Sequence, residues 1–207
     1  MSTTRDDRAK IKSPVRRGPW LVHADREIYR NPWIRITEHD VTHPTGAAGI
    51  YGVVHLQNLA VGCVPILDDG SVILVGQHRF PLDVYSWELP EGGGAFDDPQ
   101  GSAERELKEE TGYSAASWLP LVEMDLSNAV TDERAVGFLA WDLTEGMAEP
   151  DEAEELALRR VPFAEAFEMA MTGEIRDSFS QTMLMKTDIL GRRGALPDKV
   201  AELLGYR

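Results

Sequence analysis

A short glutamate-rich segment constrains this chain most. Residues 91–113 read EGGGAFDDPQGSAERELKEETGY, a glycine run followed by a stretch with helix signals at both ends. Asp98 can cap a helix, and Pro99 fits its first position, where a missing N–H group costs nothing. Gly112 suits the left-handed residue that follows a helix. The sequence therefore predicts a helix from Pro99 to Thr111.

Three carboxylates share one face of this predicted helix. Glu106 and Glu110 lie one turn apart, with Glu109 beside them. Like charges at this spacing destabilise a helix by roughly 0.2–0.5 kcal/mol, so their presence indicates a divalent cation bound by carboxylate oxygens. Mg²⁺ is the expected ion, and Mn²⁺ is the alternative. The competing interpretation is a solvated acidic face whose glutamates pair with Arg105 and Lys108.

The spacing of residues 105–113 resembles the second half of the Nudix hydrolase signature, G-x5-E-x7-R-E-U-x-E-E-x-G-U, in which U is apolar. Every fixed position of that half is present. The first half differs: counted back from the helix, the glycine position falls on Glu91 and the first acidic position on Asp97. Counted forward from Gly92, the acidic position is Asp98 and the chain is one residue short. A one-residue deletion in the loop accounts for both counts.

The region before the segment, residues 49–94, looks like the same region of the ADP-ribose pyrophosphatase branch of this family. The specific matches are QHRF at 77–80 and WELP at 87–90, and the resemblance extends over residues 20–190. It implies an α+β fold, a Nudix-type α/β/α sandwich with a mixed sheet and an extra N-terminal strand unit. It also implies that the substrate is a nucleoside diphosphate linked to a sugar.

The resemblance assigns roles to the helix residues. Glu106 and Glu110 would bind the metal, with Glu109 as a shared ligand and the Glu91 carbonyl as a backbone ligand. Arg105 would orient Glu109 through a charge-assisted hydrogen bond. A metal held there would neutralise diphosphate oxygens and lower the pKa of a bound water.

An acidic run at residues 149–155 follows the second strand beyond the helix. By resemblance, a glutamate in a mobile loop here helps bind a metal or activates the attacking water, and Glu152 and Glu154 match it equally well. Glu133, at the end of a predicted substrate-facing loop, is the lesser candidate. That loop lacks the proline usual in ADP-ribose-specific members, so the sequence does not indicate ADP-ribose as the one preferred substrate. A solvated charge run is the competing interpretation.

Substrate contacts are expected from two further regions. The guanidinium fork of Arg79 suits a diphosphate, although an ion pair with Glu88 accounts for it equally well. In the resembling branch the first strands pair with a second subunit and contribute aromatic residues to the nucleobase pocket. Tyr29 and Trp33 are the candidates here, and a homodimer is expected on the same ground.

Simple strand patterns surround the glutamate segment. Residues 20–42 read as two strands separated by a turn at Asn31-Pro32. Residues 58–67 and 71–80 read as a hairpin of two buried strands around Asp68-Asp69-Gly70. Residues 1–18 are polar and without period and are expected to form a mobile arm, followed by one domain over 19–207 whose strand unit, 19–57, is a dimerisation candidate.

Composition excludes several classes of protein. A net charge of −14 argues against binding a nucleic-acid backbone. The single cysteine, Cys63, lies in an apolar run, which excludes a disulfide framework and fits a reducing cytoplasm. No run approaches the roughly 20 apolar residues of a membrane span, and the N-terminus has no apolar signal core.

The predicted function is Mg²⁺-dependent hydrolysis of a nucleoside diphosphate sugar, of the ADP-ribose or NDP-hexose type, to a nucleoside monophosphate and a sugar phosphate. Two alternatives stay open. One is a housecleaning pyrophosphohydrolase of nucleoside triphosphates, and the other is a non-catalytic nucleotide sensor on the same scaffold.

Overall fold

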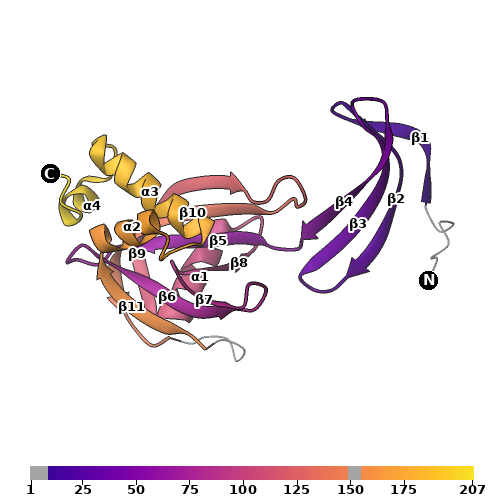
Figure 1. Ribbon diagram of the computed structural model, residues 1–207. Coiled ribbons are helices and arrows are strands. Elements are labelled where there is room, and N and C mark those ends of the chain that lie inside the picture. Colours follow the sequence, from indigo (N-terminus) through magenta and orange to yellow (C-terminus); the bar gives the residue numbers. More distant parts are fainter. Residues whose placement is uncertain (1–8, 149–154) are drawn as a thin grey trace. The chain divides into compact units, whose positions relative to one another are not determined.

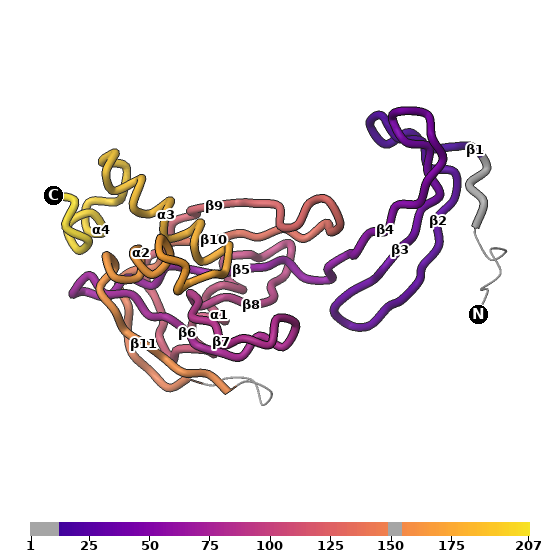
Figure 2. The backbone as a smooth tube through the Cα atoms, in the orientation of Figure 1, coloured from indigo at the N-terminus to yellow at the C-terminus, as the bar shows by residue number. Residues whose placement is uncertain are grey.

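The computed structural model describes residues 9–148 and 155–207, which form two compact units (Figure 1). The N-terminal unit comprises the chain up to Asn58 together with Asp125–Glu133. The main unit comprises Leu59–Met124 and Arg134–Arg207. Each unit is described by itself, and Figure 2 follows the backbone through both.

An antiparallel sheet of four strands, in the order β1-β2-β3-β4, forms the N-terminal unit. Its strands are β1 (Ala9–Arg17), β2 (Trp20–Arg30), β3 (Ile34–Thr42) and β4 (Ala48–Leu56). The predicted turn between β2 and β3 is confirmed, because the side-chain oxygen of Asn31 accepts hydrogen bonds from the backbone N–H groups of Trp33 and Ile34, at 2.9 and 2.8 Å.

Strand β1 differs from the expectation for residues 1–18. Ala9–Arg17 pairs with β2, although its sequence is polar and lacks a period. The two backbones pair, with Val15 opposite Val22 and Arg17 opposite Trp20. The extended conformation of β1 therefore depends on pairing with β2 rather than on a pattern in its own sequence.

The main unit contains two sheets. The first has the order β8-β5-β10-β9, and β5 and β10 are parallel whereas β5 and β8 are antiparallel, so this sheet is mixed as expected. Its strands are β5 (Leu59–Pro65), β8 (Glu91–Gly94), β9 (Tyr113–Asp125) and β10 (Arg134–Glu145). The second is antiparallel with the order β11-β6-β7, formed by β6 (Ser71–Arg79), β7 (Val84–Glu88) and β11 (Ala157–Pro162).

The predicted hairpin of β5 and β6 is wrong in its pairing. The turn is present, with the Gly70 N–H donating to the Leu67 carbonyl at 2.9 Å and Gly70 at φ +75°. The two strands nevertheless enter different sheets and share only an isolated bridge between Ile66 and Val72. Both strands are buried on both faces, so their apolar sequences carry no alternation that would fix a partner.

Helix α1 (Pro99–Thr111) has the predicted bounds and caps. The Asp98 side chain accepts a hydrogen bond from the Gly101 N–H at 3.0 Å, and Gly112 is left-handed with φ +78°. The other helices are α2 (Phe163–Thr172), α3 (Ser178–Arg192) and α4 (Asp198–Leu203). No helix in the described part of the chain is long and apolar enough to cross a membrane.

Helices cover both faces of the mixed sheet. On one face, Ala103 and Leu107 of α1 pack in a buried cluster with Val61 and Cys63 of β5. On the other face, a Cβ atom built on Gly62 would lie 3.1 Å from the ring of Phe179 in α3. Because side chains alternate along a strand, these contacts give the α/β/α layering that was expected.

Leu107→Ala tests this core. Leu107 is fully buried between α1 and β5, so we expect its truncation to lower the free energy of unfolding by about 2–5 kcal/mol. Urea denaturation followed by circular dichroism measures the change. Glu104→Ala, at an exposed position of the same helix, is the matched control and should stay within about 0.5 kcal/mol of wild type. Equal effects of the two changes would contradict the packing described here.

Candidate active site

The acidic face of α1 is ordered by one arginine. Nη2 of Arg105 donates to a carboxylate oxygen of Glu106 at 2.6 Å, and its Nη1 donates to Glu109. Nη2 also donates to the carbonyl oxygen of Gly93, at 2.8 Å. Partial burial lowers the pKa of Arg105, but the contacts with Glu106 and Glu109 outweigh it, so the net pKa is raised. The contact expected between Arg105 and Glu109 is therefore present, and Arg105 also contacts Glu106 and the glycine strand.

Strand β8 lies close against α1. A Cβ atom built on Gly94 would lie 2.7 Å from the Cβ atom of Ser102, whereas one built on Gly92 would meet the movable carboxylate of Glu106. The backbone N–H of Glu91 donates to Glu110 at 3.0 Å. Asp98, one of the two acidic positions that the sequence counts allow, caps α1 through its carboxylate.

Behind β8 lies a buried group of charged residues. Nε of Arg79 donates to both carboxylate oxygens of Glu88 at 3.0 Å, and its Nη2 also donates to Glu88. Glu88 is 2% exposed, so the ion pair with Arg79 that sequence allowed is present. The Glu91 carboxylate lies 3.5 Å from Nη2 of Arg79. Burial, followed by the negative charges of Asp177 and Glu88, raises the pKa of Glu91 well above its usual value.

Two residues of this group come from the start of α3. The Ser180 hydroxyl donates to the Glu91 carboxylate at 3.3 Å, and its oxygen accepts the Leu89 N–H at 2.9 Å. Asp177 caps α3 by accepting the Ser180 N–H at 2.6 Å. Sequence analysis did not identify these residues, because 89 positions separate Ser180 from the Glu91 carboxylate and no local pattern indicates the contact.

The remaining predicted site residues lie in the N-terminal unit or outside the described residues. Tyr29 and Trp33 lie in the N-terminal unit, at the end of β2 and just before β3, and are 51% and 66% exposed. Glu133 ends the 125–133 segment of that unit, where its carbonyl accepts the Leu126 N–H at 2.9 Å. Glu152 and Glu154 lie outside the described residues.

The donor set fits a hard divalent cation. Carboxylate oxygens from Glu106 and Glu110 face the glycine strand β8, and Glu110 is only 4% exposed. Within the described ranges, no three acidic, histidine or cysteine side chains already surround a common point as a formed metal site. Arg105 holds Glu106 and Glu109 in ion pairs here, so metal binding would require these contacts to rearrange.

Two sequence profiles match the chain and divide it close to the boundary of the units. The profile described as NUDIX domain matches residues 56–182. The profile described as nucleoside diphosphate sugar hydrolase N-terminal domain matches residues 17–54. The first covers the α1 helix, the glycine strand and the buried charged group, and the second covers β2, β3 and most of β4.

Several named proteins are similar to this chain. An ADP-ribose pyrophosphatase of Bacillus subtilis is 31% identical over 158 residues, which are 75% of this chain and 85% of that protein. An ADP-ribose pyrophosphatase of Mycobacterium tuberculosis is 35% identical over 125 residues, 58% of this chain and 60% of that protein. A CMP-5'-(N-acetyl-N-hydroxy-3-aminopropyl)phosphonate hydrolase of Streptomyces rubellomurinus is 30% identical over 182 residues, covering 85% of this chain and 84% of that protein.

The fold also has a counterpart among solved structures. The structure of an ADP compounds hydrolase superposes with a TM-score of 0.74 at 21% identity, covering 91% of this chain and 100% of that one. This similarity concerns the fold alone. The NUDIX profile, which matches residues 56–182, shows that the chain belongs to the Nudix hydrolase family.

Proposed function

We propose that the protein is a Mg²⁺-dependent hydrolase of nucleoside diphosphate sugars that releases a nucleoside monophosphate and a sugar phosphate. The observation that carries the proposal is the approach of the Glu106 and Glu110 carboxylates to the glycine strand. The choice of substrate class is supported by the N-terminal profile at residues 17–54 and by the names of the relatives. Mn²⁺ is the alternative ion, since carboxylate ligands suit both.

The acidic residues of the main unit and Arg105 have different proposed roles. Glu106 and Glu110 would hold the cation, assisted by Glu109 and the Glu91 carbonyl. When bound, the cation neutralises diphosphate oxygens and lowers the pKa of a coordinated water. Arg105 offsets the repulsion between Glu106 and Glu109, because it donates to both.

Arg79 is the proposed contact for the substrate diphosphate. Glu88 takes its Nε and Nη2 donors and fixes the plane of the guanidinium, which leaves Nη1 for a phosphate oxygen. In this arrangement Glu88 acts on the substrate through Arg79. The general base would be Glu152 or Glu154, with Glu133 as the lesser candidate.

The N-terminal unit would select the base. We propose that residues 19–57 pair with a second copy of the chain and that Tyr29 and Trp33, both largely exposed, stack on the nucleobase. Strand β1, the described part of residues 1–18, is attached to β2 of that unit. A cytoplasmic location accords with the buried, unpaired Cys63.

The two alternatives predict different products. Hydrolysis of nucleoside triphosphates would release pyrophosphate, and a sensor would bind nucleotides without turnover. Incubation with Mg²⁺ and a panel of sugar nucleotides and triphosphates distinguishes them. The panel should include CDP-linked compounds, because one relative is named for a CMP-linked substrate. Release of sugar phosphate is the expected result, whereas pyrophosphate alone, or a thermal shift with no product, would overturn the proposal.

Glu110→Gln should leave the fold intact and lower kcat by two orders of magnitude or more. Glutamine keeps an oxygen that can accept the Glu91 N–H but loses the charge that would bind the cation. Steady-state kinetics with Mg²⁺ and circular dichroism provide the measurement. Glu104→Gln, on the exposed face of α1, is the control and should remain near wild-type activity. Activity of Glu110→Gln within a few fold of wild type would refute the metal assignment.

Trp33→Ala tests the stacking role. We expect KM to rise about tenfold with little change in kcat, since loss of one base–aromatic stack costs about 1–3 kcal/mol. The side chain is 66% exposed, so the fold should be unaffected. Ile28→Ala, at a 50% exposed position of the same unit, is the matched control. An unchanged KM for Trp33→Ala would remove this residue from the proposed pocket.

A further inference from the structure

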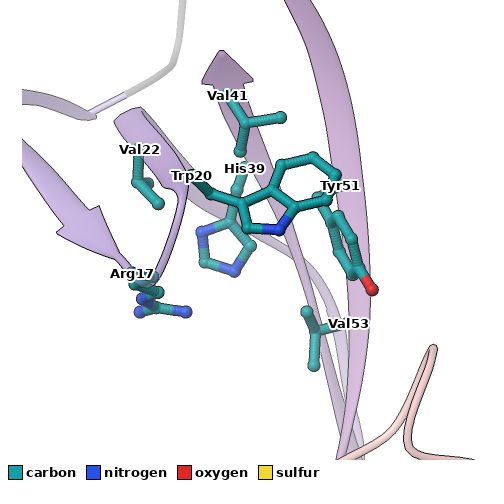
Figure 3. A pocket seen from close by; sticks show the side chains of 7 residues that line it. All are labelled: Arg17, Trp20, Val22, His39, Val41, Tyr51 and Val53. Carbon is teal, nitrogen blue, oxygen red and sulfur yellow. The ribbon is translucent and has the colours of Figure 1, made fainter. Parts of the chain in front are cut away.

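The proposed reaction leaves a hollow and a buried hydroxyl group without a role. The hollow, of about 220 Å³, is lined by residues of the N-terminal unit (Figure 3). The hydroxyl belongs to Ser180, which is fully buried in the main unit, where it contacts Glu91 of the glycine strand. Because that strand faces the proposed cation ligands of α1, Ser180 is the feature that bears on cation binding.

The Ser180 hydroxyl bonds to both ends of the corner between β7 and β8. Its oxygen accepts the Leu89 N–H at 2.9 Å, and the hydroxyl donates to the Glu91 carboxylate at 3.3 Å. Strand β7 ends at Glu88 and β8 begins at Glu91, so Leu89 opens the corner and Glu91 closes it. Leu89 is also fully buried, and a buried N–H group without a partner is costly. One hydroxyl group therefore attaches the corner to α3.

Ser180 is itself held in place by the first turn of α3. Its backbone N–H donates to the capping carboxylate of Asp177 at 2.6 Å. The preceding residue, Phe179, is buried, and a Cβ atom built on Gly62 of β5 would lie 3.1 Å from its ring. A capped helix end that packs closely against a sheet has little freedom to move. Ser180 therefore provides a fixed attachment for the β7–β8 corner.

The corner also determines which way the Glu91 backbone points. In an antiparallel pair, the N–H and C=O groups of one residue point to the same side, and those of the next residue point to the other. The Pro90 carbonyl accepts the Cys63 N–H at 3.0 Å and so faces β5. The Glu91 N–H points to the opposite edge, where it donates to Glu110 at 3.0 Å. The Glu91 carbonyl, a proposed cation ligand, therefore belongs to the edge that faces α1.

We propose that Ser180 is a positioning residue for cation binding. Its hydroxyl holds the β7–β8 corner where the Glu91 carbonyl and the Glu110 carboxylate can bind one ion, and it acts through Glu91 without touching the ion. The proposal rests on the proposed function, because it uses the same two ligands. The competing interpretation is a purely structural hydroxyl, whose loss would lower the stability of the protein and leave its affinity for the cation unchanged.

Binding of Mn²⁺ to the full chain in the absence of substrate tests the proposal. Electron paramagnetic resonance measures the free ion, so no turnover is needed. Glu110→Gln, which removes a proposed ligand, identifies the part of the binding that belongs to this site. Ser180→Ala should weaken that part about tenfold, because residues that orient a metal ligand typically contribute about 10- to 100-fold to metal affinity.

Thr187→Val is the matched control. Thr187 is also a fully buried residue of α3, but its hydroxyl donates to the Met183 carbonyl of the same helix, at 2.8 Å. The change removes one buried hydroxyl that has no bond to β8, so the Mn²⁺ affinity should stay within about twofold of wild type. Thermal unfolding of Ser180→Ala and Thr187→Val measures the structural effect of each change separately.

An unchanged Mn²⁺ affinity in Ser180→Ala would overturn the positioning role and leave the proposed function standing. An equal loss of affinity in Thr187→Val would also overturn it, because the effect would then be a general loosening of α3. If the wild type shows no binding that Glu110→Gln removes, the cation assignment of the proposed function fails and the positioning role fails with it. If circular dichroism shows that Ser180→Ala is unfolded, Ser180→Thr and Ser180→Val replace it. These two variants have the same shape, and Ser180→Val, without the hydroxyl, should bind Mn²⁺ about tenfold more weakly than Ser180→Thr.

Discussion

The distance between α1 and strand β8 determines the geometry on which the candidate active site depends. Gly94 lies so close to α1 that a Cβ atom on it would stand 2.7 Å from the Cβ atom of Ser102. Two hydrogen bonds also join β8 to α1. The Glu91 N–H donates to the Glu110 carboxylate, and Arg105 donates to the Gly93 carbonyl. Helix and strand are thus held by bonds that also orient the carboxylates, so the site is formed by the fold itself.

Buried charge is the second constraint. Glu88 and Glu110 are both almost fully buried, and Glu91 lies between them. Removal of two or three charges from water is expensive unless each finds a partner. Arg79 donates three hydrogen bonds to Glu88. The backbone N–H of Glu91 donates to Glu110, and the Ser180 hydroxyl donates to the Glu91 carboxylate. Burial, followed by the negative charges of Asp177 and Glu88, keeps the pKa of Glu91 above its usual value despite these contacts.

Sequence predicted what is local and missed what is not. The bounds and caps of α1 were readable because Asp98, Pro99 and Gly112 each act within one turn of the helix. The pairing of β5 with β10 was not readable, because two strands buried on both faces carry no alternation to indicate their neighbours. Ser180 was missed for the same reason, since its contact with Glu91 depends on how α3 crosses the sheet.

Strand β4 holds the segment that ends at Glu133 through side-chain hydrogen bonds. The Tyr51 hydroxyl donates to the Ala129 carbonyl at 2.6 Å. The Asp132 carboxylate accepts the Leu56 N–H at 3.1 Å and lies 2.5 Å from Nδ1 of His55. Residues 125–133 are therefore placed in the N-terminal unit by contacts with residues more than 70 positions earlier, and no local pattern in the sequence indicates them.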